Sequence, residues 1–499
     1  MDLASMFVNA VRQNREKVVL YHGESSLTYG QLSCLSRQVA AHLIDHHGIQ
    51  PGDRVAIWMD NCTEFITCFL GILQCGAVVV PINHFLTYHE AEGILCDAEA
   101  RVVLVDSKHQ QASEPMQRWQ GSIDSPSESC LRTKQDSLPN PSLPANRLPQ
   151  ASEEDLAVLI YTSGTTGNPK GAMLTHRNLL HNATSCRHTM AVTQADRVAV
   201  VLPLFHSFML TVGVIMPILC GASILLLKSL HPARRVLQDI CRRHATILPA
   251  IPQLYRAWAS MDLPKLPLRL CISGAAPLPM EILKRFNRSS PAPIIESYGL
   301  SEASPVVTLN PIAGPQKPGS IGLPIHDVEV AIKDEAGKQL PAGETGELWV
   351  RGANVMLGYW KREEATREVL CEGWLKTGDM GHQDAEGFLY VTDRKKDMLL
   401  VNGINVYPRE IEEIIYRYDG VKEASVVGKP DGRKGEQPVA FVVMEDGVSA
   451  QAIDLVSFLK PQLASYKVPQ QIHFLESLPR TATGKVQKTR LRDKLVGAD

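Results

Sequence analysis

A loop of small, hydroxylated residues and one lysine is the feature of this chain best suited to chemistry. Residues 161–171 have the sequence YTSGTTGNPKG and follow an apolar run expected to be a buried strand. Small side chains let the backbone approach a ligand, and N–H groups, hydroxyls and one ammonium suit a polyphosphate. The spacing is not that of a Walker loop, and the competing interpretation is an ordinary Gly/Thr turn. The residues expected to bind phosphate are Thr162, Ser163, Gly164, Thr165, Thr166 and Lys170.

This loop resembles the signature loop of the adenylate-forming superfamily, which includes acyl- and aryl-CoA synthetases, firefly luciferase and the adenylation domains of peptide synthetases. The resemblance covers essentially the whole chain, because the family's other motifs follow in order, and it is strongest to fatty-acid–CoA ligases. Those motifs are LPLFHSFM at 202–209, ISGAAPL at 272–278, ESYGLSE at 296–302, TGD at 377–379, DRKKDMLLVNGINVYPREIE at 393–412 and PRTATGK at 479–485.

The resemblance implies a reaction in two halves. A carboxylate attacks the α-phosphate of ATP and gives an acyl-adenylate and pyrophosphate. A thiol, usually that of coenzyme A, then displaces AMP and gives a thioester. The carboxylate is its own nucleophile, so catalysis consists of positioning and of neutralising charge on phosphate oxygens. The expected function is an AMP-forming ligase for medium- or long-chain fatty acids, with ATP, Mg²⁺ and coenzyme A.

Several motif residues are assigned to ATP by this resemblance. Glu302 ends YGLSE and would hold Mg²⁺, a hard cation that prefers carboxylate and phosphate oxygens. Ser301 stands where relatives usually have threonine and keeps a hydroxyl for the α-phosphate. Thr166 of the phosphate loop joins Glu302 among the catalytic residues. Tyr298 offers a ring face to adenine, and the remaining base-pocket residues would be Gly274, Ala275, Glu296 and Ser297.

Two further motifs supply the ribose contacts and a catalytic lysine. Asp379 matches the family carboxylate that accepts both ribose hydroxyls, and Arg394 matches the second ribose contact; the competing interpretation of Asp379 is a turn residue. Lys485 matches the lysine that bridges the acyl carboxylate and the α-phosphate. Its competing interpretation is one more charge in a basic tail. The other tail residues, expected to form a solvated helix face, are Lys488, Arg490, Arg492 and Lys494.

The resemblance also implies a domain movement. Lys396 falls where the family has its interdomain hinge. The C-terminal unit closes one way to present Lys485 for adenylation, and then rotates to present Gly403, beside which a pantetheine arm can pack. His206 would lie beside the acyl pocket and the thiol, or else be a core histidine. Lys228 would meet a phosphate of coenzyme A, or else be a charge at a strand end.

The acyl pocket implied by the family is apolar or small, which disfavours a polar amino-acid substrate. Met209 stands where fatty-acyl ligases often have a smaller residue, so chain length and the choice between aliphatic and aromatic acids stay open. A hydrophobic pocket discriminates each methylene by only about 1–3 kcal/mol, so broad chain-length tolerance is expected. The residues assigned to this pocket are His206, Phe208, Val212, Gly274, Pro305 and Val306.

Other functions remain as alternatives. The nearest are an aryl- or short-acid CoA ligase and a ligase that loads an acyl carrier protein, and a luciferase-type oxygenase is more remote. A catalytically inactive binding protein is disfavoured because the chain keeps Lys170, Glu302, Asp379, Arg394 and Lys485. A serine hydrolase is disfavoured because the chain has no G-x-S-x-G motif.

The elements that must position these groups indicate an α/β protein. Apolar runs at 55–59, 77–81 and 101–106 alternate with helical patterns, one of them opened by Thr63 as an N-cap, and alternation resumes from 156 to 278, which predicts βαβ units. Short alternating strands after Pro311 indicate a small antiparallel or barrel-like subdomain. We expect an ATP- and acyl-binding domain over 1–393 with two βαβ-type sheets and this subdomain, a hinge at 394–396, and a mobile α+β domain over 397–499.

Two segments depart from this alternation. Residues 108–150 are rich in proline and serine and lack an apolar period, so a long surface loop or insertion is expected. Residues 207–227 carry no charge, and about 20 apolar residues can span a bilayer. Because glycine and proline interrupt this segment, a buried helix, turn and strand is favoured over a membrane span.

Composition limits the partners. Lysine and arginine number 51 and acids 53, for a net charge of −2, which argues against a nucleic-acid-binding protein. The eleven cysteines are scattered, and no Cys/His cluster with zinc spacing is expected, so the compartment is predicted to be reducing and cytoplasmic. The N-terminus lacks the pattern of a signal peptide. The expected partners are small molecules, with an acyl carrier protein, peripheral membrane contact and a homodimer left open beside a monomer.

Overall fold

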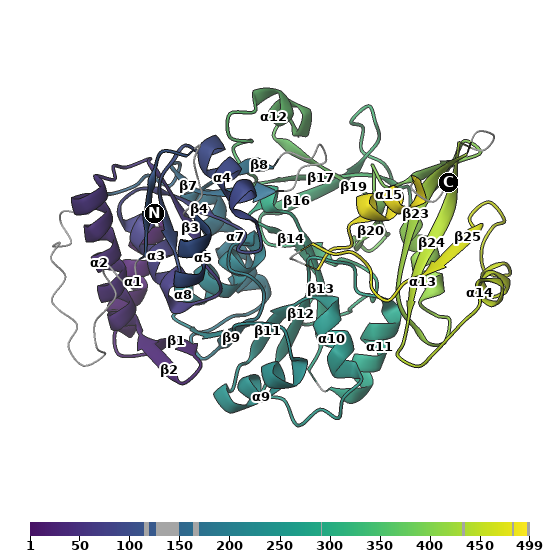
Figure 1. The fold of residues 1–499 in the computed structure, drawn as a ribbon, viewed down its shortest axis with the longest axis horizontal. Helices are drawn as coiled ribbons and strands as arrows, with labels where there is room; N and C mark the ends of the chain where they lie inside the picture. The colour runs from purple at the N-terminus through teal and green to yellow at the C-terminus, as the bar shows by residue number, and fades with distance from the viewer. Residues whose placement is uncertain are drawn as a thin grey trace.

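The computed structural model describes residues 1–113, 119–125, 149–162, 169–290, 292–431, 435–481 and 484–496. These residues form an α/β molecule with sheets of six, nine, five and five strands. Figure 1 shows a large N-terminal body, purple to green, with the C-terminal unit lying against one end of it. This architecture confirms the fold class expected from the sequence.

The six-stranded sheet has the order β6-β5-β3-β4-β7-β8. Its strands run parallel except for β8, which pairs antiparallel with β7 across the two ends of the phosphate loop. The loop therefore leaves the sheet at the carboxyl end of β7. The strands are β3 (Arg54–Trp58), β4 (Val78–Pro81), β5 (Ala100–Val105), β6 (Ser122–Asp124), β7 (Leu156–Thr162) and β8 (Lys170–Thr175), and the intervening helices are α3 (Thr63–Gln74), α4 (Tyr88–Asp97) and α5 (Ser107–Ser113).

The nine-stranded sheet has the order β15-β14-β13-β12-β11-β9-β10-β1-β2. Strands β1 and β2, from the N-terminus of the chain, join this sheet although they are far from its other strands in sequence. Strand β1 lies parallel to β10, and Leu20 pairs with Ile224. The strands are β1 (Val18–His22), β2 (Ser25–Thr28), β9 (Arg197–Val200), β10 (Ser223–Leu226), β11 (Ile247–Ala250), β12 (Leu270–Ser273), β13 (Ile294–Gly299), β14 (Val306–Leu309) and β15 (Leu323–Pro324). The helices associated with it are α7 (His176–Thr189), α9 (Ala233–Arg243), α10 (Pro252–Ala259) and α11 (Met280–Ser289).

Two helices precede the first sheet in the chain, α1 (Leu3–Asn14) and α2 (Tyr29–His47). Helix α2 begins with a capping box, in which Thr28 and Gln31 each bond the other's backbone N–H, and it ends at Gly48 in the left-handed region. Both features satisfy backbone groups that a helix end leaves unpaired. They explain why α2 begins and ends where it does.

The uncharged stretch at 207–227 is a buried helix, turn and strand, as expected. A π-helical turn, η2 (Met209–Ile215), continues into α8 (Met216–Leu219), and the chain turns at Gly221 into β10. Every residue of η2 and β10 is buried. Within the described ranges, every helix falls short of the length and apolar character needed to cross a bilayer.

The third sheet is antiparallel and follows the nine-stranded sheet in the chain, as expected for the region after Pro311. The fourth sheet forms the core of the C-terminal unit, where α13 packs on β23. The third sheet contains β16 (Val328–Lys333), β17 (Gly346–Gly352), β18 (Leu370–Cys371), β19 (Trp374–Gln383) and β20 (Leu389–Arg394), with α12 (Glu363–Val369) beside it. The C-terminal elements are β21 (Leu399–Val401), β22 (Ile404–Val406), α13 (Pro408–Ile415), β23 (Val421–Asp431), β24 (Gly435–Met444), α14 (Ala452–Leu459), β25 (Gln471–Phe474) and α15 (Lys488–Val496).

Two sequence-based expectations need correction. Thr63 is the first helical residue of α3 rather than its N-cap, because Cys62 occupies the cap position with extended backbone. The described parts of 108–150 also contain more than loop: α5 extends to Ser113, and β6 adds an edge strand to the first sheet. The rest of that expectation, at 114–118 and 126–148, lies outside the described residues.

Candidate active site

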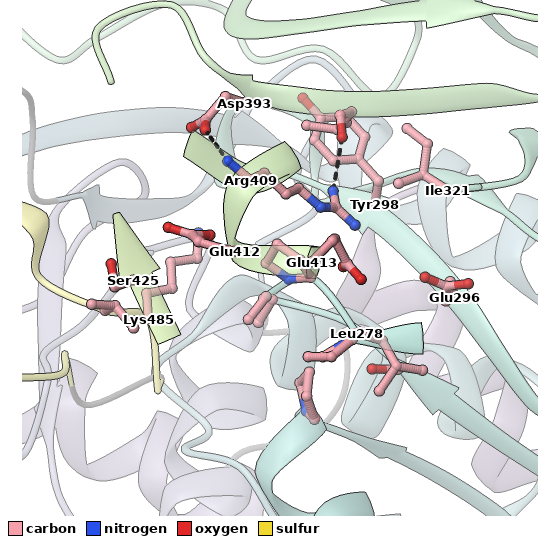
Figure 2. Close-up of a pocket in the computed structure, with 18 of the residues that line it drawn as sticks. Leu278, Glu296, Tyr298, Ile321, Asp393, Arg409, Glu412, Glu413, Ser425 and Lys485 are labelled. Carbon is pink, nitrogen blue, oxygen red and sulfur yellow. Dashed lines mark hydrogen bonds between the residues drawn. The ribbon is translucent and has the colours of Figure 1, made fainter. Parts of the chain in front are cut away.

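A cavity of about 300 Å³ lies between the N-terminal body and the C-terminal unit. Figure 2 shows Tyr298 and Glu296 of β13 on one side, with Glu412 and Glu413 of α13 and Lys485 of the C-terminal unit facing them. The cavity therefore has walls from both parts of the chain. The sequence-predicted residues that line it are Ala275, Glu296, Ser297, Tyr298, Asp379, Arg394 and Lys485.

Three of these residues form a bonded group in the cavity wall. The Tyr298 hydroxyl donates to Asp379 Oδ2 at 2.6 Å, and Arg394 Nε lies 3.1 Å from Asp379 Oδ1. Burial, followed by the charge of Asp379, raises the pKa of Tyr298 well above its usual range, so the hydroxyl stays protonated as a donor. The paired strands β19 and β20 bring Asp379 opposite Arg394. The arrangement offers a fixed carboxylate to a ligand with neighbouring hydroxyls.

A second group lies where β8, which follows the phosphate loop, meets the segment between β17 and α12. The Tyr359 hydroxyl donates to Glu302 Oε1 at 2.9 Å, and Lys170 Nζ lies 5.3 Å from the centroid of the Tyr359 ring. Ser301 Oγ and Ser207 Oγ are 3.0 Å apart, so a hydrogen bond joins the segments that carry them. These contacts bring one lysine, one carboxylate and three hydroxyls together. Cations, acceptors and donors in this combination suit a polyphosphate and its metal ion.

The remaining residues predicted for the adenine site lie at the ends of β12 and β13. A Cβ at Gly274 would be 2.9 Å from Ser297 Oγ and 3.2 Å from Phe208 Cζ, so a larger residue there would force Ser297 or Phe208 to move. Glu296 Oε2 accepts from the Gly319 N–H at 2.8 Å. Burial raises the pKa of Glu296 to about 7. A carboxyl held near its neutral form can donate as well as accept a hydrogen bond.

Lys485 and His206 approach the site from opposite parts of the chain. The cavity walls desolvate the ammonium of Lys485 and Arg394 repels it, which lowers its pKa, while Asp379 and Glu302 act in the opposite direction. Burial, followed by the charge of Lys485, lowers the pKa of His206 to about 3, so this ring is neutral at physiological pH. The Phe208 N–H donates to His206 Nδ1 at 3.2 Å, which leaves the ring proton on Nε2.

A set of polar contacts holds the C-terminal unit in the orientation that presents Lys485. Glu423 of β23 lies between two arginines, with Oε1 3.0 Å from Arg256 of α10 and Oε2 3.0 Å from Arg480. Gln253 Nε2 also donates to the Gly484 carbonyl at 3.1 Å. Glu423 is buried and lies directly across the boundary between the two parts of the chain. We call Arg256, Glu423 and Arg480 the interdomain triad.

A second cavity of about 270 Å³ adjoins the first, since Gln253 and Arg480 line both. Lys228, His84 and Phe85 line its other parts. The predicted residue Lys228 therefore lies in a different cavity from the residues predicted to bind the nucleotide. The two cavities meet beside the Gln253–Gly484 contact.

The predicted acyl-pocket residues lie behind the first cavity rather than on its lining. Phe208, Val212, Pro305 and Val306 are all buried. The Phe208 ring packs on Gly274, and Val212 belongs to the π-helical turn η2. Phe208 thus stands between the residues predicted to bind the nucleotide and the apolar interior.

Other predicted residues lie apart from the cavity or outside the described part. Gly403 is exposed in the turn between β21 and β22, with φ of +78°, and Lys396 is exposed in the segment before β21. Thr162 is at the end of β7, where its hydroxyl contacts the Lys170 carbonyl at 3.5 Å. The predictions for Ser163, Gly164, Thr165 and Thr166 fall on residues outside the described part of the chain.

The basic tail is not simply a solvated face. Lys488 lies 3.0 Å from Glu412 and is 16 % exposed, and Arg492 pairs with Asp397 at 2.6 Å. These pairs fix α15 to the rest of the C-terminal unit, which the charge pattern alone did not show.

The sequence interpretation missed several residues in or beside the site. Tyr359, which contacts both Glu302 and Lys170, carries no motif of its own. Arg480 stands inside PRTATGK, so its motif was a usable signal. Arg256 and Glu423 offered no signal, because each is an ordinary charged residue until the fold brings them together.

Comparisons with known proteins agree with this geometry. The model of the AMP-binding enzyme family matches residues 7–360, and that of the AMP-binding enzyme C-terminal domain matches residues 410–485. A long-chain-fatty-acid–CoA ligase of Bacillus subtilis (strain 168) is 35% identical, with 99% of this chain and 94% of that protein covered. A feruloyl-CoA synthase of Amycolatopsis sp is 35% identical, with 98% of each covered. The crystal structure of ATP-bound MatB from Rhodopseudomonas palustris superposes with a TM-score of 0.91 at 30% identity, covering 99% of both chains.

The chain therefore belongs to the AMP-binding enzyme family, within the adenylate-forming superfamily. It is an acyl-CoA synthetase of the AMP-forming type, which uses ATP to join a carboxylic acid to coenzyme A.

The interdomain triad leads to a first prediction. Glu423→Ala should slow acid-dependent pyrophosphate release about tenfold, because coupling between conformations is typically 1–3 kcal/mol and the variant leaves two arginines facing each other. The matched control is Asp446→Ala, which breaks the neighbouring but exposed Lys422–Asp446 pair and should change the rate little. Equal rates for both variants would show that the triad does not favour this orientation.

Proposed function

We propose that this synthetase activates medium- or long-chain fatty acids, and that the cavity between its two parts is the adenylation site. The observation that carries the first statement is the wholly buried, uncharged wall from Phe208 through η2, which an aliphatic chain can enter without desolvating a charge. The convergence of Asp379, Arg394 and Lys485 on one cavity supports the second.

In the proposed adenylation step, an oxygen of the fatty carboxylate forms a bond to the α-phosphorus of ATP while the bond to pyrophosphate breaks. Asp379 and Arg394 bind the ribose, and Tyr298 holds the Asp379 carboxylate in place by its 2.6 Å hydrogen bond. Lys485 neutralises the two anions that must approach each other. Its three rotatable donors and compact charge suit a group that contacts both carboxylate and phosphate.

Glu302 fits the Mg²⁺ expected with ATP. Its carboxylate offers the hard oxygen ligand that Mg²⁺ prefers, and the Tyr359 hydroxyl orients it. When bound, the ion would neutralise charge on phosphate oxygens. The residues proposed to act on the same phosphates are Lys170, Ser301 and the loop at 163–168.

In the proposed second step, the sulfur of coenzyme A bonds to the acyl carbonyl carbon, AMP leaves with the electron pair, and the thiol proton is lost. The second cavity supports this step, because Lys228 can meet a phosphate of coenzyme A and the cavity leads towards the first one at Gln253. His206 is neutral with its ring proton on Nε2, so in this proposal it donates a hydrogen bond to the reacting groups. Rotation of the C-terminal unit would replace Lys485 with the turn that carries Gly403.

A substrate panel tests the proposed acid. We expect AMP formation with saturated acids from about C8 to C18 to exceed that with acetate, benzoate and ferulate, and neighbouring chain lengths to differ by no more than about 10- to 200-fold. The feruloyl-CoA synthase relative makes the aromatic acid the second candidate. Turnover of ferulate without turnover of any aliphatic acid would replace the proposal with an aryl ligase.

The same panel can locate the pocket. Met209→Ala should shift the preferred chain length upward, because Met209 is a buried residue of η2 next to Phe208 and a smaller side chain would lengthen the proposed acyl pocket. The matched control is Met216→Ala, which removes an equally buried methionine from the adjoining α8. Identical shifts in both variants would place the acyl chain elsewhere.

A further inference from the structure

Two histidines and one aspartate, side chains that commonly bind metal ions, lie together at the end of the molecule away from the active site. His42 Nε2 lies 2.7 Å, and His47 Nε2 3.2 Å, from the same oxygen, Oδ2 of Asp124. Both histidines belong to the last two turns of α2, whereas Asp124 ends the edge strand β6. The ligand atoms all lie within 4.8 Å of one another. In Figure 1, α2 lies on the side of the molecule opposite the C-terminal unit.

The geometry points to a site for a divalent transition-metal ion of the Zn²⁺ type, and we propose that His42, His47 and Asp124 hold it. Imidazole nitrogens and carboxylate oxygens bind Zn²⁺ at about 2.0–2.2 Å, which places tetrahedral ligand atoms roughly 3.3 Å apart. The observed separations of 2.7 and 3.2 Å are close to this value. Small side-chain movements are therefore enough to admit the ion.

The surroundings of this cluster favour a cation. His46 lies on the same helix, and its ring centroid is 4.6 Å from that of His42, so a third imidazole stands beside the cluster. The carboxyl-terminal end of a helix carries partial negative charge, and α2 ends at Gly48, one residue after His47. The side chains of His42 and His47 are 17% exposed and that of Asp124 is 11% exposed, so an ion can enter from solvent.

Such an ion would link strand β6 to the end of helix α2. Strand β6 has three residues and pairs only with β5 among the described strands. Coordination would fasten the end of β6 to the end of α2, a structural role separate from the Mg²⁺ chemistry proposed for Glu302. Binding to the folded form alone would also raise the thermal unfolding temperature.

The experiment measures Zn²⁺ binding to the full chain after removal of metal with a chelator. Competition with a chromophoric chelator should reveal one Zn²⁺ per wild-type chain whose affinity falls at least 10- to 100-fold in Asp124→Asn, since even changes outside the ligand set have effects of that size. The matched control is Asp45→Asn, the same chemical change at an exposed position of α2, which should keep wild-type affinity. His47→Gln provides a second ligand variant if Asp124→Asn does not fold.

Two further measurements complete the test. Zn²⁺ should raise the unfolding temperature of the wild type and of Asp45→Asn, but not that of either ligand variant. Co²⁺ bound in place of Zn²⁺ should show no thiolate charge-transfer band, because the proposed ligands contain no sulfur. The proposal would be overturned by equal affinity in wild type and both ligand variants, by equal loss in Asp45→Asn, or by a thiolate band.

Discussion

Lys485→Ala is expected to lower the rate of acyl-adenylate formation by about 10²- to 10³-fold, the loss typical when one preorganised charge or donor is removed from a reacting phosphate or carbonyl. In this structure Lys485 faces the cavity that Asp379 and Arg394 also line, and both Asp379 and Glu302 interact with its charge. The rate of acid-dependent pyrophosphate release measures this step. Thioester formation from supplied acyl-AMP and coenzyme A should be largely preserved, because that half does not bring two anions together.

The matched control is Lys494→Ala, which removes an exposed lysine from the same C-terminal tail. It should leave both half-reactions near their wild-type rates. Equal losses in the two half-reactions of Lys485→Ala would contradict the assignment of this lysine to adenylation. A full rate of pyrophosphate release would contradict the assignment of the cavity itself.

Gly403→Leu is expected to have the opposite pattern. Pyrophosphate release should stay near the wild-type rate, while transfer of the acyl group to coenzyme A should fall about 10²-fold, the scale of a small misplacement of reacting groups. Gly403 lies in an exposed turn of the C-terminal unit, and a Cβ there meets nothing within 4 Å. A side chain at this position therefore meets no neighbour in this orientation, and we expect it to disturb the reaction in the other orientation of the C-terminal unit, where this turn would contact the pantetheine arm.

Backbone strain is the alternative cause, since Gly403 has φ of +78°. Gly447→Leu controls for it, because Gly447 has φ of +80°, belongs to the same unit and also has open space around its Cα. The two variants should lose similar stability, but only Gly403→Leu should lose thioester formation. Parallel losses of activity would assign the effect to strain and remove the support for domain alternation.

The sequence was most informative where function depends on consecutive residues. The run ESYGLSE positions Glu296, Tyr298 and Glu302 on one strand and the turn after it, and its resemblance to the family motif predicted that they serve one nucleotide site. Alternating apolar segments likewise predicted β3, β4 and β5 to within one or two residues, because the pattern of a buried parallel strand is local.

Local pattern was least informative where pairing joins distant segments. Strand β1 was not assigned to the second sheet, because its partner β10 lies about 200 positions further on and nothing near Leu20 specifies it. The partners of Lys488 and Arg492 could not be predicted either, because they lie far away in the sequence. The spacing of these two residues alone indicated a solvated helix. Charge patterns show which side chains are charged, but only the fold shows which opposite charges they meet.

By itself, the sequence determined the family and the α/β class, and its motifs predicted which groups carry the adenylation chemistry, because short motifs are local patterns. Only the tertiary structure decided how Lys485 reaches the cavity, which arginines enclose Glu423, and that His42 and His47 face Asp124. No zinc spacing was expected from the sequence, since the carboxylate lies 77 positions beyond His47. The physical reason is that burial and pairing depend on distance in space, and chain order fixes that distance only within a single helix, strand or turn.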